Sequence, residues 1–222
     1  MAQAEFYRQL AGELTEHNAT LVAVSKIQPV EKITKLYELG QRDFGENYVQ
    51  ELVDKSARLP TDIRWHFIGH LQSNKVRQIL PVVTLIHGVD SLKLLKEIDK
   101  QSQRLDKQTD CLLQVFIADE KTKFGVDESE LNEIIHQQLA GLSSVRVRGL
   151  MGMASFTDDE QKIDAEFKEL RRLFDHHRNY FEKAGEPILS MGMSADYRIA
   201  LANGSTMVRI GSLLFGARPP KA

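Results

Sequence analysis

The sequence predicts an α/β fold in which residues 1–222 form a single (β/α)8 TIM barrel with an extra N-terminal helix. Short apolar runs rich in β-branched residues alternate with amphipathic stretches, and eight such pairs follow one another along the chain. This alternation is typical of parallel βαβ units. A chain of 222 residues has the length of one α/β barrel, and no Pro/Gly-rich or low-complexity segment divides it.

The first strand places a lysine where α/β barrels carry out their chemistry. A helix is predicted over residues 2–16, followed by the apolar run 21–24, which has the pattern of a strand buried on both faces. Lys26 lies at the carboxyl end of that strand, the end at which barrels place their active sites. A partly desolvated lysine can form a Schiff base with an aldehyde. The alternative is an ordinary solvated lysine.

The remaining elements follow from the same alternation. Further strands are predicted at 43–47, 63–69, 82–87, 111–117, 145–151, 187–190 and 206–210. Helices are predicted at 30–40, 48–59, 74–80, 92–105, 129–138, around 163–181, at 194–202, and as a short segment from 212. Ser91 is predicted to cap the helix that begins at residue 92.

Composition excludes several classes of function. A net charge of −2 gives no electrostatic reason to expect a nucleic-acid or membrane partner. The single cysteine, Cys111, excludes an internal disulfide and indicates a reducing compartment, and its apolar surroundings favour a buried, inert thiol. The N-terminus lacks the features of a signal peptide, and no apolar run has membrane-spanning length. We therefore expect a cytoplasmic protein, and a monomer, because no apolar stripe demands a dimer.

The loops after the last two strands have the composition of a phosphate site. Gly192 and Ser194 follow the seventh strand, where the glycine permits close backbone approach and the serine can cap the next helix. Gly211 and Ser212 follow the eighth strand and can present further N–H and hydroxyl donors. In α/β barrels these two loops often bind phosphate. Ordinary turn and capping chemistry uses the same residues and is the alternative.

A lysine at strand one and a phosphate site at strands seven and eight are neighbours around a closed barrel. Pyridoxal 5′-phosphate (PLP) carries both an aldehyde and a phosphate, so it is the cofactor that this arrangement predicts. Arg209 on strand eight would then face the pyridine nitrogen, and an arginine there leaves that nitrogen unprotonated. The alternative for Arg209 is an ion pair at the barrel end with a carboxylate such as Glu46, and both roles are compatible.

Several motifs resemble the YggS/PROSC family of pyridoxal phosphate homeostasis proteins over about residues 21–218. They are Ser25-Lys26 with Pro29, 44–51 (FGENYVQE), 65–72 (WHFIGHLQ) with Asn74-Lys75, 190–194 (SMGMS), 204–211 (GSTMVRIG) and 215–218 (FGAR). The last block is highly specific. The family in turn resembles the barrel domain of bacterial alanine racemase.

The resemblance implies a PLP-binding site made of Lys26, Asn47, His66, Met191, Gly192, Ser194, Arg209, Gly211 and Ser212. In it, Lys26 carries the Schiff base, Arg209 faces the pyridine nitrogen, Asn47 and His66 line the ring, and the serines with Gly211 contact the phosphate. Two positions depart from the family pattern: Ile27 stands where Thr is frequent, and Phe116 where Asn is common. Phe116 puts a polar contact from strand five in doubt, whereas Glu120, Lys123 and Gly125 keep the pattern.

No metal site is predicted. His66 and His70 flank a strand end with no third ligand evident, and His176 and His177 are neighbours that point in different directions from a helix. Structural zinc sites need four ligands, so solvated or hydrogen-bonded histidines are expected at both pairs.

The site predicts a carrier that buffers PLP and delivers it to PLP-dependent apoenzymes, with no catalytic residues assigned. The alternative is an amino-acid racemase or decarboxylase that uses the same site. The related racemases need a second base from an extra β domain, which is expected to be absent because the barrel extends to Ala222. Open access to the cofactor favours exchange over carbanion chemistry, which requires water exclusion. A third possibility is a Schiff-base aldolase acting on sugar phosphates.

Overall fold

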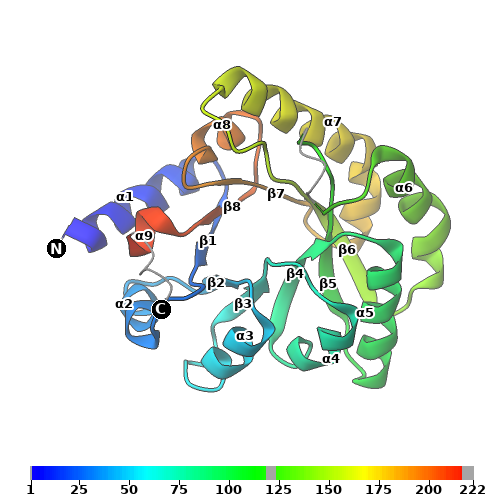
Figure 1. The fold of residues 1–222 in the computed structure, drawn as a ribbon, viewed down its shortest axis with the longest axis horizontal. Helices are drawn as coiled ribbons and strands as arrows, with labels where there is room; N and C mark the ends of the chain where they lie inside the picture. Colours follow the sequence, from blue (N-terminus) through cyan, green and yellow to red (C-terminus); the bar gives the residue numbers. More distant parts are fainter. Residues whose placement is uncertain (1, 119–123, 217–222) are drawn as a thin grey trace.

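The computed structural model describes residues 2–118 and 124–216 and contains a closed barrel of parallel strands in the order β1 to β8 (Figure 1). The strands are β1 (Thr20–Val24), β2 (Asp43–Glu46), β3 (Arg64–Phe67), β4 (Val83–Val89), β5 (Thr109–Gln114), β6 (Val145–Met151), β7 (Ile188–Met193) and β8 (Met207–Ile210). β1 pairs with both β2 and β8, which closes the ring. The predicted TIM-barrel class is confirmed.

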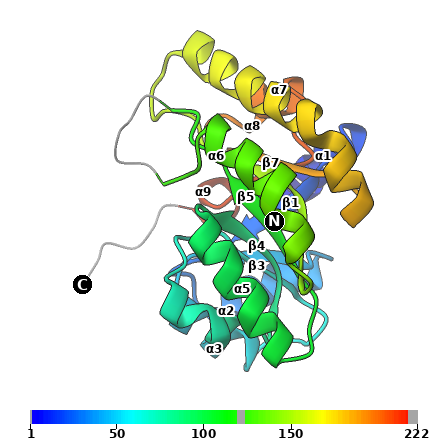
Figure 2. The ribbon, with the colours of Figure 1, turned by 90° about the vertical axis from the view of Figure 1, so that its right-hand side faces the viewer.

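A helical segment follows each strand, and one further helix precedes β1. The α-helices are α1 (Ala2–Glu16), α2 (Val30–Glu38), α3 (Val49–Ser56), α4 (Val76–Ile79), α5 (Leu92–Arg104), α6 (Glu128–Glu133), α7 (Glu160–Ala184), α8 (Tyr197–Ala202) and α9 (Ser212–Phe215). Short 3₁₀ turns are η1 (Ser73–Lys75) and η3 (Leu139–Gly141), and η2 (Ile134–Gln138) is a π-helical turn. Figure 2 shows α5, α6 and α7 around the outside of the strands.

The extra helix α1 is fastened to the end of the barrel chain. Glu13 accepts hydrogen bonds from Tyr197 and Arg198 of α8, and the Gln3 side chain donates to the carbonyl of Leu214 in α9. Figure 1 shows α1 beside α9 and β1. The helix therefore covers the seam at which the last strand meets the first.

Two apolar clusters follow from the alternation of side chains along each strand. The larger cluster fills the space between barrel and helices and contains Ala23, Phe44, Met191 and Val208. The smaller cluster fills the barrel interior with one apolar residue from each of five strands: Val22, Leu85, Leu112, Met151 and Met207. The interior positions left by this second cluster are available to polar side chains.

Most predicted elements are confirmed, and the differences are at the ends. Ser91 caps α5 by accepting from the N–H of Leu94. β7 continues to Met193, three residues beyond the predicted end, and α8 begins only after Asp196. The prediction that Ser194 caps this helix is wrong. The predicted helix 129–138 is α6 followed by the π-helical turn η2, in which the hydrogen-bond spacing widens.

Cys111 is fully buried, and burial raises the pKa of its thiol well above the ordinary value, as expected for an inert side chain. Among the described residues, no helix combines the length and apolar character needed to cross a bilayer.

Candidate functional site

Lys26 lies just past the end of β1, in a turn between β1 and α2. β1 ends at Val24, and the Lys26 side chain is half-buried two residues later. The neighbouring loops are close: a Cβ on Gly211 would lie 3.2 Å from the Val24 carbonyl oxygen, and Ser25 donates its N–H to the carbonyl of Gly45. The turn is therefore held against the ends of both β2 and β8.

A buried charge cluster fixes this turn from the outer side of the barrel. Lys55 Nζ on α3 donates to the Ser25 carbonyl oxygen (2.7 Å), to Glu46 Oε1 (2.8 Å) and to Glu51 Oε1 (2.7 Å). Glu51 Oε1 also accepts the backbone N–H of Ile27 (2.6 Å), and Ser25 Oγ donates to Glu46 Oε1 (2.5 Å). Residues 25 and 27, on both sides of Lys26, are thus bound to the same cluster.

Glu46 is the fully buried carboxyl group of the cluster. Its side chain is 0% exposed, and its Oε2 has no hydrogen-bond partner among the described residues. Burial raises the pKa of Glu46 to about 7, against the opposing effect of Lys55. The ion pair between Arg209 and Glu46, which was the alternative role for Arg209, does not form. Glu46 faces α3, whereas Arg209 points into the barrel and bonds to Ser190 of β7 and to Gly152, which follows β6.

Ile27 adopts a left-handed backbone conformation with φ of 63°. A β-branched residue is disfavoured there, and such strain costs about 1–3 kcal/mol. The bond from its N–H to Glu51 helps hold the chain in this shape. The strained residue directly follows the predicted Schiff-base lysine, so the direction of Lys26 is imposed by the surrounding contacts and not by local preference.

A chain of hydrogen bonds crosses the barrel interior from β8 to β2. Arg209 Nη1 donates to Ser190 Oγ (2.6 Å), which contacts His87 Nδ1 (3.1 Å). His87 Nε2 lies 2.9 Å from His66 Nδ1, and His66 Nε2 lies 3.0 Å from Asp43 Oδ1. These five residues come from β8, β7, β4, β3 and β2, and all are buried.

The two ends of the chain fix the direction of its protons when both imidazoles are neutral. Arginine can only donate and an ionised carboxylate can only accept, so Ser190 donates to His87, His87 to His66, and His66 to Asp43. Burial, with the charges of His66 and Arg209, holds the pKa of His87 well below its ordinary value. Burial raises the pKa of Asp43, but hydrogen bonds from His66 and Arg64 outweigh burial and the net pKa is lowered.

Arg209 is anchored by this interior network. Nη1 also donates to the Ser190 carbonyl (2.9 Å) and Nη2 to the Gly152 carbonyl (3.0 Å). Burial lowers the pKa of the guanidinium to about 10, and the Asp196 carboxylate opposes that effect, so the group stays cationic at neutral pH. The described bonds use three of its five N–H groups.

The loops after β7 and β8 meet, as predicted for a phosphate site. The N–H of Gly211 donates to Ser194 Oγ (3.3 Å), which joins the two loops directly. Ser194 is half-buried and Ser212 is exposed at the start of α9. Gly192 has φ of 93°, and a Cβ there would lie 2.6 Å from the Cβ of Ala200. Its close backbone approach is therefore to α8.

The remaining residues singled out in the sequence lie in different surroundings. Asn47 follows β2, and its buried Oδ1 has no hydrogen-bond partner in the described part of the chain. Met191 is fully buried in the cluster between barrel and helices, so only its backbone faces the loops. His66 is buried within the barrel, with both ring nitrogens bonded. His70 bonds to Asp90 and stacks on a phenylalanine ring.

On β5 the buried polar side chain is that of Gln114, and not of residue 116, where the sequence departs from the family pattern. Phe116 is half-buried and lies beyond the end of β5. Its backbone packs closely on Gly125, since a Cβ added to Gly125 would lie 2.7 Å from the Phe116 nitrogen. Gln114, two residues earlier, is buried and donates to the Phe124 carbonyl (2.7 Å). Glu120 and Lys123, which keep the family pattern, lie outside the described residues.

Comparison with known proteins identifies the family. The family model "alanine racemase, N-terminal domain" matches residues 4–219. A pyridoxal phosphate homeostasis protein of Aquifex aeolicus is 40% identical over 204 residues, which are 91% of this chain and 89% of that protein. This chain belongs to the family of pyridoxal phosphate homeostasis proteins.

Solved structures agree with this assignment. PipY of Synechococcus elongatus, solved with PLP bound, has a TM-score of 0.87 at 36% identity, and the match covers 96% of this chain and all of PipY. The alanine racemase of Bartonella henselae has a TM-score of 0.72 at 17% identity, covering 98% of this chain and 59% of the racemase. That more distant likeness shows the fold alone.

Sequence analysis missed most of the polar groups behind this family's barrel mouth. Asp43, His87 and Ser190 are predicted only as members of strands. In the structure all three point into the barrel, and His87 lies two residues from the interior residue Leu85. Lys55 is predicted only as part of a helix, and in the structure it is the seventh residue of α3, with its side chain buried against the end of β2.

Proposed function

We propose that this chain binds PLP at the carboxyl ends of β1, β7 and β8, with Lys26 forming a Schiff base with the aldehyde, and that it buffers and delivers the cofactor within the cell. The observation that carries the proposal is the junction of three loops. Val24, the last residue of β1 and two residues before Lys26, packs against Gly211, and Gly211 is bonded to Ser194. An amine and two hydroxyl-bearing loops thus lie at one rim of the barrel.

The chemistry of the neighbouring groups fits PLP. Arg209 is a buried cation whose remaining N–H groups can donate a hydrogen bond to a pyridine nitrogen. A guanidinium cannot accept a hydrogen bond from that nitrogen. The unpartnered Oδ1 of Asn47 is a polar atom that a ligand would satisfy. Bound PLP supplies an aldehyde for the lysine and a phosphate for Ser194, Gly211 and Ser212. A His66 contact to the ring would require one of its present bonds to be replaced.

Delivery and storage, with no substantial turnover, is the function that we propose for this site. The relatives are named homeostasis proteins, and PipY is solved both with and without PLP. We propose PLP-dependent apoenzymes as acceptors. Large apolar side chains are exposed at the end of β7 or after the end of another strand: Ile27, Tyr48, Phe124, Phe156, Met193 and Leu213. Such a rim around a binding site suits a transient protein contact.

The proposal also places the protein in the cytoplasm as a monomer. A fully buried free thiol at Cys111 is compatible with a reducing compartment. Sedimentation analysis of the purified chain tests the monomer, and a concentration-independent mass of one chain is expected.

Borohydride reduction of the PLP-loaded protein followed by peptide mass spectrometry tests the site. A pyridoxyl adduct is expected on Lys26, absent from Lys26→Ala and retained in Lys35→Ala, which removes an exposed lysine of α2. An adduct on a different lysine would refute the site. Racemisation or decarboxylation of an amino acid at ordinary enzyme rates, about 1–1000 per second, would refute the carrier role.

A further inference from the structure

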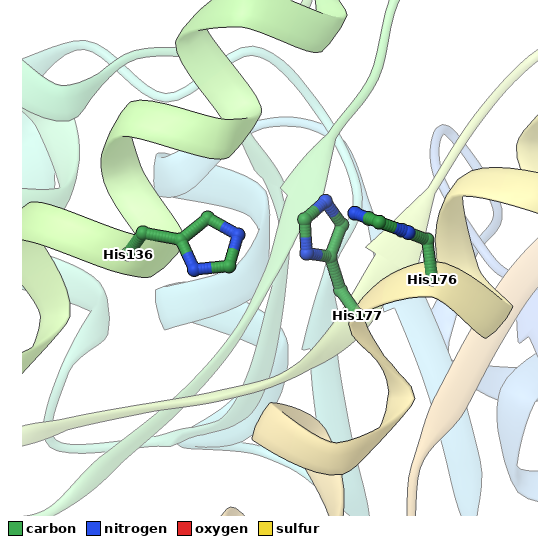
Figure 3. Close-up of side chains that lie close together, drawn as sticks. All are labelled: His136, His176 and His177. Atoms are coloured by element: carbon green, nitrogen blue, oxygen red, sulfur yellow. The ribbon is translucent and has the colours of Figure 1, made fainter.

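Three histidines meet on the outside of the barrel, away from the proposed PLP site. His136 lies in the π-helical turn η2, and His176 and His177 lie in α7 (Figure 3). One ring nitrogen from each lies within 4.8 Å of the others. Both segments lie in the part of the helical layer that leads back to the amino ends of the strands, opposite the barrel mouth.

His177 is the decisive member of this histidine cluster. Its side chain is 0% exposed, and both ring nitrogens are buried with no hydrogen-bond partner among the described residues. Buried polar atoms without partners are rare and need an explanation. Figure 3 shows its ring between those of His136 and His176, with ring centroids 5.5 Å and 4.7 Å away. One of its two unpartnered nitrogens therefore lies within 4.8 Å of a ring nitrogen of each neighbour.

The other two histidines are ready to share a ligand. His136 and His176 are exposed, so an ion can reach the cluster from solvent. His136 Nδ1 lies 2.8 Å from the hydroxyl oxygen of Tyr180, one turn beyond His176 on α7. When Nδ1–H donates to that oxygen, Nε2 is left as a lone-pair donor, which is the arrangement found in metal-ligating histidines.

We propose that His136, His176 and His177 bind one divalent transition-metal ion of the imidazole-preferring class, with Zn²⁺ as the reference ion and solvent as the fourth ligand. Three neutral imidazoles are a ligand set for this class of ion. Tetrahedral Zn–N bonds of about 2.0–2.1 Å place ligand nitrogens about 3.3 Å apart, so small side-chain rotations close the present spacing. The ion would link η2 to α7.

The local helix geometry favours such a link. η2 has π-helical hydrogen bonding, a form that is rare in helices and frequent at functional positions. The widened turn carries His136 toward α7. Arg172 of α7 carries a positive charge that would repel a bound cation, and it is bonded to Glu128 and Glu169, which offset that charge.

Calorimetric titration of the chelator-treated full chain with Zn²⁺, without added PLP, tests the proposal. One ion per chain is expected, and His136→Gln and His176→Gln should each weaken binding at least tenfold, whereas His17→Gln, a change at an exposed histidine next to α1, should not. Tyr180→Phe should weaken binding about tenfold through His136. His177 is left intact because its substitution could unfold α7.

A second readout separates a metal site from a buried water. Co²⁺ bound to the wild-type chain should give the intense ligand-field absorption of four-coordinate cobalt, and this absorption should be lost in His176→Gln. No saturable binding, or binding of equal strength in the His136, His176 and His17 variants, would overturn the proposal. Neither readout depends on PLP, so the result is separate from the proposed function.

Discussion

Replacing Lys55 with methionine tests the energetics of the buried cluster behind Lys26. In the native protein, burial raises the pKa of Glu46 from 4.5 to about 7 although Lys55 is present. Ionisation of Glu46 therefore lowers stability progressively as the pH rises from about 4.5 to about 7, and costs about 3 kcal/mol above that range. Removing Lys55 makes the ionised form still less favourable, so Glu46 stays protonated in the folded state to a higher pH.

The destabilisation that Lys55→Met causes through Glu46 has an upper bound that depends on pH. Keeping Glu46 fully protonated in the folded chain costs about 1.4 kcal/mol for each pH unit above 4.5. At about pH 6 this is close to the cost that the native protein already bears, so the extra loss through Glu46 is about zero. At about pH 8.5 it exceeds the native cost by about 2 kcal/mol. The lost bonds from Lys55 to Ser25 and Glu51 add about 2 kcal/mol at either pH.

Urea denaturation followed by circular dichroism measures both values. Lys55→Met should lower the free energy of unfolding by about 2 kcal/mol at about pH 6 and by about 4 kcal/mol at about pH 8.5. The double variant Lys55→Met/Glu46→Gln should lose this difference between the two pH values, since the Glu46 carboxyl group is no longer there to titrate. An equal loss for Lys55→Met at the two pH values, or a larger loss at the lower one, would refute the reasoning.

Three further substitutions test individual backbone and side-chain contacts by thermal or urea unfolding. Ile27→Gly should stabilise the chain by about 0.5–1 kcal/mol by relieving the left-handed backbone, whereas Ile27→Val should not. Gly192→Ala should destabilise by about 2–3 kcal/mol, because the new Cβ lies 2.6 Å from its neighbour, whereas Gly12→Ala in α1, with no atom within 4 Å, should stabilise slightly. Arg209→Lys should cost about 2–4 kcal/mol, whereas Arg198→Lys, at a side chain that is 72% exposed, should cost much less. A loss of stability in Ile27→Gly, a gain in Gly192→Ala, or equal losses in Arg209→Lys and Arg198→Lys would contradict these expectations.

The barrel could be predicted from the sequence because its signals are local. The apolar run 21–24 and the heptad-like spacing in α7 each specify an element without reference to the rest of the chain. The ends of β7 and α8 could not be predicted in this way. Residues 191–196 are shaped by tertiary contacts, namely the close packing of Gly192 on α8 and the bond from Gly211 to Ser194.

The candidate site was predictable only in its outline. Lys26 and the loops after β7 and β8 could be assigned from their place at strand ends, and the structure brings them to one rim. The partner of Arg209 could not, because choosing between Glu46 and Ser190 requires knowing which face of each strand points inward. An isolated strand of four residues fixes the alternation but not its phase.

The phase of the strands also explains how the site is supported. Side chains that point into the barrel form the hydrogen-bond chain from Arg209 to Asp43. Glu46 points outward from β2 and bonds to Lys55. The interior chain fixes the buried guanidinium, and the outer cluster fixes the turn that bears Lys26. Because the two networks share no side chain, a change in one should alter its own group and leave the other in place.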